Sequence, residues 1–282
     1  MAGSSTNGTS TNLAPGETES QHFSPYRSDG KLYGFVCIVT NATSPIGQSI
    51  ITELSTHGAA SIYACTLPSS PSFPSPSSTP SHPTGQTKII PYPYLPTEEG
   101  TLQLIDDVLN AHGRLDIWTT IATSPASGPK SLASTTPSHL SSLFEANALV
   151  PFYALKYAPP AMAKLCIKGS YPNAAPKEQR YGSIIVVAGM GSGAIGWGMS
   201  LQAGMGVVKG GARELQGTGV RVNGIRYAGV KGEEGLEAQG IGRKGRAEEV
   251  ARVAGFLASG FSVHVTGSEI VVDGGASAMG GF

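Results

Sequence analysis

Charged residues are scarce in this chain of 282 residues. Lys plus Arg and Asp plus Glu number 19 each, so the formal net charge is zero, and charged side chains make up 13% of the sequence. An ordinary soluble domain has roughly 25%. A neutral chain produces no overall field that would attract a polyanion. The composition therefore argues against nucleic acid and anionic membranes as binding partners.

Cysteine frameworks, histidine clusters and long apolar runs are also missing. Cys37, Cys65 and Cys166 are odd in number, and their spacing matches neither a disulfide framework nor a zinc site. The six histidines show no metal-ligand spacing. No stretch approaches the roughly 18 apolar residues of a membrane span, and the N-terminal residues lack the apolar core of a signal peptide. We expect reduced thiols, no metal and a soluble, cytoplasmic protein.

Composition divides the chain into a tail and one domain. Residues 1–30 are mostly Ser, Thr, Asn, Gly and Pro, which cannot bury enough apolar surface to offset the entropy of ordering, so they predict a disordered tail. The length of residues 31–282 fits one domain, and no internal repeat is visible. Residues 67–87 are rich in Pro and Ser and predict a surface loop.

Apolar runs alternate with helical patterns throughout this domain. Strands are expected at residues 32–40, 61–66, 88–94, 115–122, 183–188, 220–225 and 268–273. Helices are expected at 46–58, 97–113, 138–166, 199–216 and 247–258. The strands are continuously apolar, which is typical of a parallel sheet covered on both faces, and two prolines place the strand at 88–94 on an edge. The pattern predicts an α/β fold with a doubly wound, seven-stranded parallel sheet, a Rossmann fold.

Several segments carry a resemblance to a known family. They are RLDIWTTIA at 114–122, FEANALVPFYAL at 144–155, GVRVNGI at 219–225, and the segment 241–275 that ends in Asp-Gly-Gly. In order and spacing they resemble the short-chain dehydrogenase/reductase family over about residues 31–275. The resemblance implies a nicotinamide cofactor, a small-molecule substrate, and a dimer or tetramer in which the helices at 138–166 and 199–216 form the interface.

The dinucleotide loop of that family, TGxxxGxG, reads TNATSPIG here. Asn41 and Pro45 replace two glycines, while Thr40, Ile46 and Gly47 keep the family residue types. Asn tolerates a positive φ, and Pro suits a first helical turn although it donates no N–H. The resemblance implies that a phosphate is held by Thr40, Asn41, Thr43, Ser44 and the N–H groups of Ile46 and Gly47. The alternative, a turn that binds nothing, stays open.

The adenosine end of the site is altered as well. Cys65 and Thr66 stand where the family carries a carboxylate for the adenosine ribose. Without that carboxylate NAD loses its usual anchor, so the sequence favours NADP, and binding of neither cofactor stays open. Tyr94 aligns with an Asp that meets adenine and offers a ring to stack on it. Ala122 lies in the segment TIAT, which replaces the family's NNAG.

The catalytic pattern Tyr-x-x-x-Lys becomes WGMSL at 197–201. Trp197 takes the Tyr position and Leu201 the Lys position, and an indole donates a hydrogen bond without releasing its proton near neutral pH. Asn147 matches the Asn that kinks the family's long helix. Ser192 is the hydroxyl nearest to the family's Ser, and Tyr227 offers an ionisable phenol after the sixth predicted strand.

Two functions remain from the sequence. The first is an atypical NADP-dependent reductase of a small-molecule carbonyl or imine, in secondary metabolism, with Ser192, Tyr227 or a substrate group as proton donor. The second is a redox-silent relative: a pseudoenzyme, a binding subunit, or a cyclase or isomerase that uses the same cleft without redox chemistry.

Overall fold

The structure is a computed structural model, and it describes residues 27, 29–69, 73, 87–123, 130–166, 176–191, 194–231 and 240–279. Most of the predicted tail and most of the predicted loop at 67–87 lie outside these residues. In the described part, no helix combines the length and the hydropathy needed to cross a membrane.

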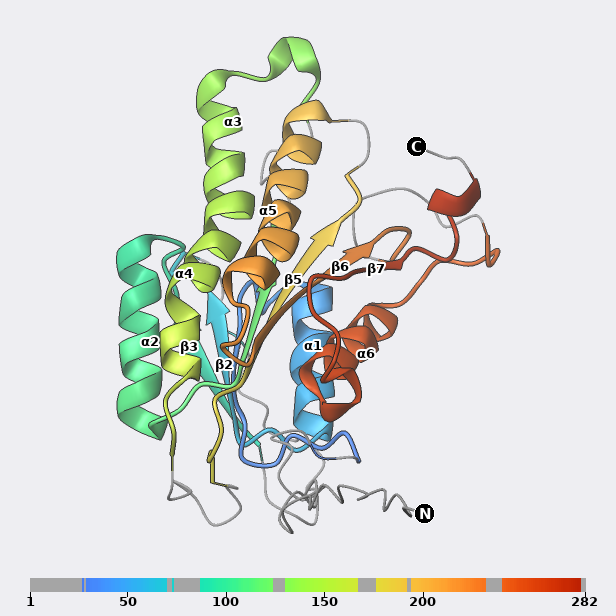
Figure 1. Cartoon of the computed structure of the whole chain (residues 1–282). Helices are drawn as coiled ribbons and strands as arrows, with labels where there is room; N and C mark the ends of the chain where they lie inside the picture. Colours follow the sequence, from blue (N-terminus) through green and yellow to red (C-terminus); the bar gives the residue numbers. More distant parts are fainter. Residues whose placement is uncertain are drawn as a thin grey trace, which may run out of the picture.

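A seven-stranded sheet forms the centre of the fold (Figure 1). Its strand order is β3-β2-β1-β4-β5-β6-β7, and every adjacent pair is parallel. The strands are β1 (Val36–Val39), β2 (Ser61–Thr66), β3 (Lys88–Pro93), β4 (Ile117–Ile121), β5 (Gly182–Gly189), β6 (Val220–Tyr227) and β7 (Glu269–Val272). The predicted doubly wound sheet is confirmed, with β3 on an edge as its prolines required.

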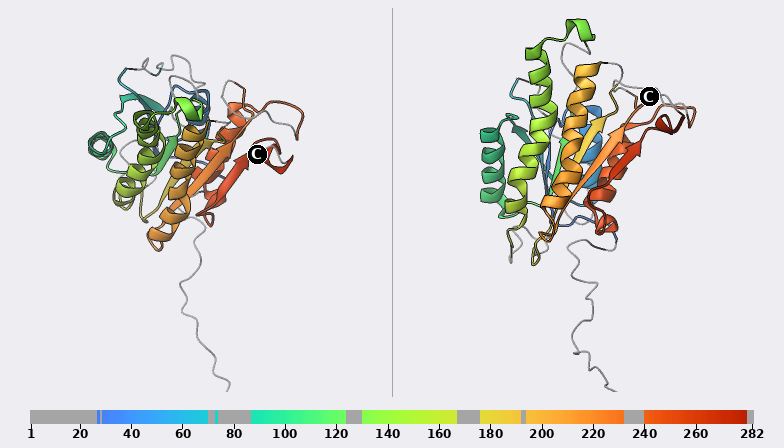
Figure 2. Two further views of the ribbon diagram at one scale, coloured as in Figure 1. Left: turned by 90° about the horizontal axis from the view of Figure 1, so that it is seen from above. Right: turned by 45° about the horizontal axis from the view of Figure 1, so that its top comes forward.

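Helices cover both faces of the sheet (Figure 2). They are α1 (Pro45–Thr56), α2 (Glu98–His112), α3 (Pro137–Phe144), α4 (Val150–Met162), α5 (Ile195–Glu214) and α6 (Ala247–Ala258), with short turns η1 (Leu132–Ser134), η3 (Gly260–Ser262) and η4 (Ser277–Met279). Helices α1 and α6 pack beside each other on one face, while α2, α4 and α5 cover the other. Two apolar layers therefore enclose the buried strands.

Local sequence explains where these helices begin and end. The Thr97 side chain accepts a hydrogen bond from the N–H of Gly100 and so caps α2, which ends at Gly113 with a φ of 68°. The Ser44 side chain caps α1 by accepting from the N–H of Gly47, with Pro45 as first helical residue. Helix α2 lies within its predicted range, and α1 begins at Pro45, one residue before the predicted start.

The long helix predicted at 138–166 is interrupted around Asn147, where the resemblance implied a kink, and it ends earlier than predicted. A π-helical turn, η2 (Glu145–Leu149), separates α3 from α4, and α4 ends at Met162. Cys166 leaves the helix because its N–H and C=O pair with the backbone of Lys177 in an antiparallel bridge. The helix predicted at 199–216 begins earlier than expected, at Ile195.

A buried ionic cluster joins the elements at the amino ends of the strands. Arg114 donates two hydrogen bonds to Asp116, at 2.9 and 3.0 Å, and the ammonium of Lys177 lies 3.1 Å from the same carboxylate. The N–H of Val36, at the start of β1, donates to Asp116 at 2.8 Å. All three charged side chains are essentially inaccessible to solvent. Burial opposes the ionisation of Asp116, but Lys177, Arg114 and the Val36 N–H together hold its pKa below the ordinary value.

Replacing Asp116 should strongly destabilise the fold. Asp116→Asn leaves Arg114 and Lys177 buried without the carboxylate, and removal of one partner from a buried ion pair costs about 3–5 kcal/mol. Lys177→Met should cost less, because the paired Arg114 and Asp116 remain. Urea unfolding at pH 7 measures both losses. Equal losses would contradict the role of charge balance in this cluster.

The contribution of Asp116 should also depend on pH. Its pKa is lower in the folded chain than the value of about 3.9 expected when unfolded. The stabilisation is therefore complete above the unfolded value and is lost as the pH falls through the folded value. The difference in unfolding free energy between wild type and Asp116→Asn should shrink accordingly in acid titrations.

Candidate functional site

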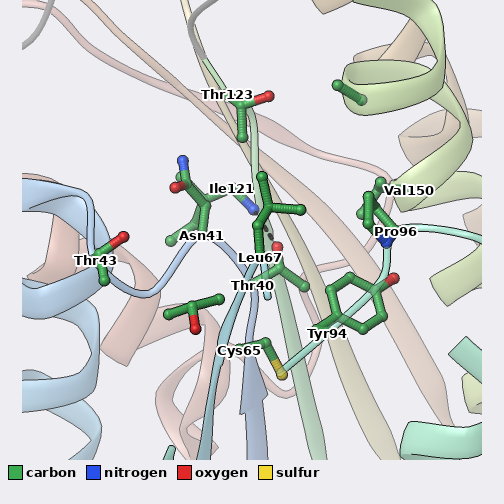
Figure 3. A pocket seen from close by; sticks show the side chains of 12 residues that line it. Thr40, Asn41, Thr43, Cys65, Leu67, Tyr94, Pro96, Ile121, Thr123 and Val150 are labelled. Atoms are coloured by element: carbon green, nitrogen blue, oxygen red, sulfur yellow. Dashed lines mark hydrogen bonds between the residues drawn. The ribbon is translucent and has the colours of Figure 1, made fainter. Parts of the chain in front are cut away.

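A cavity of about 100 Å³ lies at the carboxyl ends of the strands (Figure 3). β1 has β2 on one side and β4 on the other, so the strand order reverses here, which is where ligands bind in open α/β sheets. The lining residues are Thr40, Asn41, Thr43, Cys65, Thr66, Leu67, Tyr94, Pro96, Ile121, Thr123, Ala146 and Val150. None of these described residues carries a charge at neutral pH, so the cavity is electrically neutral.

Asn41 gives the turn after β1 its shape. Its φ is +50°, the only positive φ of a non-glycine residue in the described part of the chain, a conformation that costs most L-residues about 1–2 kcal/mol. Its side-chain amide donates to the carbonyl of Ala122, just after β4, at 3.2 Å. The carbonyl of Asn41 accepts from the hydroxyl of Ser44 at 2.9 Å. The turn is thereby tied both to β4 and to the start of α1.

Two of the predicted phosphate contacts are paired with each other. The hydroxyl of Ser44 accepts from the N–H of Gly47 at 3.0 Å. The side chain of Gln48 donates to the carbonyl of Thr43 at 2.8 Å, and Pro45 supplies no N–H. In the described part of the chain, this leaves the buried residue Ile46 as the first-turn N–H to which no side chain is committed. All six predicted phosphate contacts stay predictions, and of these the Thr43 hydroxyl and the Ile46 N–H have no hydrogen-bond partner among the described residues.

Buried neutral groups form the end of the cavity that lies away from Asn41 and Thr123 (Figure 3). The thiol of Cys65 is inaccessible, and burial raises its pKa well above the ordinary value. The phenol of Tyr94 hydrogen-bonds the hydroxyl of Thr101 at 3.0 Å, and burial raises the pKa of Tyr94 to about 12. Thr66 ends β2 beside Cys65, and the hydroxyl of Thr40 accepts from the N–H of Ile121 at 3.1 Å. Cys65 and Tyr94 remain neutral at physiological pH.

Asn147 lies in the π-helical turn and connects three elements. Its side-chain oxygen accepts from the N–H of Thr123 at 2.8 Å, and its amide donates to the carbonyl of Thr123 and to the hydroxyl of Ser200, both at 3.2 Å. A Cβ added at Gly204 would lie 2.1 Å from the carbonyl oxygen of Asn147. Asn147 therefore fastens the end of β4 to α5, while Gly204 permits their close approach.

Trp197 and Leu201 form part of an apolar cluster beneath α5. Both are nearly inaccessible, and they pack with Leu143, Val186, Ala188, Met205 and Val208. The indole N–H of Trp197 has no hydrogen-bond partner among the described residues. Trp197 and Leu201 are therefore packing side chains, and the indole N–H of Trp197 is a buried donor without a partner in the described part of the chain.

The other two catalytic candidates are not gathered around Trp197. Tyr227 is 6% exposed at the end of β6 and packs in the apolar cluster beneath α1 and α6, so it belongs to a different cluster from Trp197. A Cβ added at Gly189 would lie 3.5 Å from the ring of Tyr227, which places the phenol across the end of β5. Ser192 lies outside the described residues.

Sequence reasoning missed part of the lining. Six lining residues were not candidates: Leu67, Pro96, Ile121, Thr123, Ala146 and Val150. Four of them lie at or just beyond the carboxyl end of a strand. That position could have identified them from the predicted strands. Val150 opens α4 behind the π-helical turn, which lies at Asn147, where the resemblance implied a kink in the helix.

Comparison with known proteins gives consistent matches. Residues 96–277 match the family model described as Enoyl-(Acyl carrier protein) reductase. The chain is 34% identical over 114 residues to 3-oxoacyl-[acyl-carrier-protein] reductase FabG of Thermotoga maritima, covering 35% of this chain and 46% of that protein. It is 34% identical over 127 residues to Oxidoreductase asL5 of Sarocladium schorii, covering 39% and 50%. The chain thus spans about half the length of these curated relatives.

Solved structures share the fold. A short-chain type dehydrogenase/reductase from Mycobacterium marinum superimposes with a TM-score of 0.69 at 19% identity, covering 87% of this chain and 96% of that one. An aldohexose dehydrogenase from Thermoplasma acidophilum gives a TM-score of 0.69 at 19% identity, covering 89% and 96%. At this level of identity the likeness concerns the fold alone.

Removing the Asn147 side chain should loosen the end of β4. Asn147→Ala leaves the N–H of Thr123 without its acceptor, and a buried donor without a partner costs about 1–3 kcal/mol. Urea unfolding measures the loss, with Asn110→Ala on the exposed side of α2 as control. A loss no larger than that of the control would show that Asn147 does not fasten β4 to α5.

Proposed function

Because the chain belongs to the short-chain dehydrogenase/reductase family, whose fold implies a nicotinamide cofactor, we propose that it is an NADP-dependent reductase of a small-molecule carbonyl or imine. The observation that carries this proposal is the neutral cavity at the point where the strand order reverses. When bound, the nicotinamide ring would supply a hydride to the substrate carbon. The chain's own residues must bind and orient the cofactor and the substrate, and one group must donate the proton that the reduction requires.

The residues at the adenosine end fit this cofactor. The hydrogen bond between Tyr94 and Thr101 fixes the Tyr94 ring in the cavity wall, where it offers a face for adenine. Thr66 offers a neutral hydroxyl to the phosphate that distinguishes NADP from NAD. Cys65 provides no carboxylate for the ribose of NAD. These contacts support NADP over NAD, with an affinity limited by the absence of a cation in the lining.

The residues at the start of α1 fit the phosphates of the cofactor less completely. The positive end of the α1 dipole faces the site, but the Gly47 N–H is engaged by Ser44 and Pro45 has none. The N–H of Ile46 and the hydroxyl of Thr43 are the contacts that remain. We therefore expect weaker binding than a glycine-rich loop gives.

The proton requires a donor other than the side chains at 197 and 201. Trp197 does not ionise and Leu201 carries no charge, so neither repeats the Tyr and Lys chemistry. We assign the proton transfer to the phenol of Tyr227, with Ser192 and a group of the substrate as alternatives.

We also propose that the protein forms homo-oligomers. Leu149 and Phe152 next to the π-helical turn, and Ile195 and Met199 on α5, are large apolar side chains that are 38–50% exposed. Exposed apolar side chains on neighbouring helices are typical of subunit interfaces. Family members assemble through the corresponding helices, which supports the same arrangement here.

Calorimetric titration tests the cofactor assignment. NADPH should bind more tightly than NADH, and Cys65→Asp should shift the preference toward NADH, because it supplies a carboxylate at the end of β2. Cys166→Ser, which lies away from the cavity, serves as the matched control. Tight binding of NADH by the wild type would contradict the proposal.

Activity measurements on a panel of small ketones and imines test the proton donor. Tyr227→Phe keeps the ring but removes the hydroxyl, and kcat should fall about 10²–10⁴-fold, the usual contribution of general acid catalysis. Trp197→Phe should leave NADPH oxidation within a few-fold of the wild type.

The double variant Trp197→Tyr with Leu201→Lys distinguishes the alternative. If the wild type oxidises no NADPH while this variant does, the natural protein is redox-silent and the proposal of a reductase is wrong. Thermal unfolding of each variant shows whether the fold is retained.

A further inference from the structure

We propose that the side chain of Asn41 is a latch that divides the ligand crevice, so that a nucleotide fragment binds beside it while an intact dinucleotide must displace it. The inference rests on the proposed function for the class of ligand. It concerns Asn41 alone and is tested by binding rather than by turnover.

The latch joins the two loops that diverge where the strand order of the sheet reverses, after β1 and after β4. The chain after β1 turns to α1 on one face of the sheet, and the chain after β4 leads toward α3 and α4 on the other. A ligand crevice opens between two loops that part in this way. The hydrogen bond from the Asn41 amide to the Ala122 carbonyl runs between them.

The conformation of Asn41 holds this bond in place. With a φ of +50°, the residue adopts a backbone conformation that glycine reaches without strain. Hydrogen bonds from the N–H and the hydroxyl of Ser44 to the Asn41 carbonyl fix the peptide. The N–H of Ala42 donates to the backbone carbonyl of Cys65. A glycine would form the same turn without placing an amide across the crevice.

The latch separates two regions that a dinucleotide must occupy together. Figure 3 shows Cys65 and Tyr94 at one end of the cavity and Asn41 and Thr123 at the other. The cavity lies over β1 to β4, whereas Tyr227 stands at the end of β6 beyond β5. The side chains proposed for the adenosine end, Cys65 and Tyr94, lie in this cavity, but a ligand that also reaches Tyr227 must pass Asn41.

The direct test compares the affinity of NADPH with that of its fragment 2′,5′-ADP by calorimetry. In the wild type, NADPH should bind little better than the fragment. Asn41→Gly removes the latch and suits the positive φ, so NADPH should bind roughly three- to tenfold more tightly, the range set by one net hydrogen bond. The affinity for 2′,5′-ADP should stay unchanged.

A matched control and a second variant make the result specific. Gln48→Ala removes another side-chain bond in the same turn, to Thr43 rather than to β4, and should leave both affinities unchanged. Asn41→Ala removes the amide as well and should shift the ratio of the two affinities in the same direction, at some cost in thermal stability. It keeps the test available if the glycine variant folds poorly.

Other outcomes overturn the latch. Weaker NADPH binding in Asn41→Gly would show that the amide contacts the ligand, and equal gains for both ligands would show a general loosening of the turn. NADPH binding by the wild type that is unaffected in either variant removes the latch but leaves the proposed function intact. Absence of NADPH and NADH binding in every variant overturns both proposals.

Discussion

The buried carboxylate of Asp116 is the group on which the arrangement of the strands depends. It accepts from the start of β1, from Arg114 and from Lys177, which lies in the segment leading to β5. One carboxylate thus fixes the amino ends of three neighbouring strands in the middle of the sheet. The cavity lies at the carboxyl ends of these strands. Because the strands start together and pair in register, they also end at a common edge.

At that edge, the described side chains that line the cavity are neutral. Cys65 and Thr66 end β2, Tyr94 follows β3, and Trp197 and Leu201 lie in an apolar cluster beneath α5. In the absence of fixed charges, shape and a few hydrogen bonds must select the ligand. Under the proposed function, affinity would depend on the shape and hydrogen bonds of the cavity wall and on how the turn after β1 is held, rather than on ion pairs.

Local patterns predicted most of the fold and part of the site. The caps at Thr97 and Gly113, and the prolines of β3, act within a few residues, so the sequence alone located those elements. The π-helical turn at Asn147, the burial of Lys177 and the bond from Asn41 to Ala122 join residues distant along the chain. No periodicity or spacing encodes such contacts. Alignment with family motifs located Asn41, but only tertiary packing shows which group it bonds.

The contact between Gly204 and the Asn147 carbonyl limits how the chain is able to diverge. Any side chain at 204 would collide with the backbone of the π-helical turn, so α5 cannot slide along its neighbour or move away without breaking the link to β4. On the opposite side of α5, the glycines at 198, 206 and 210 face open space. Within one subunit, evolution or an engineer is therefore free to place side chains at these three glycines, whereas position 204 tolerates none.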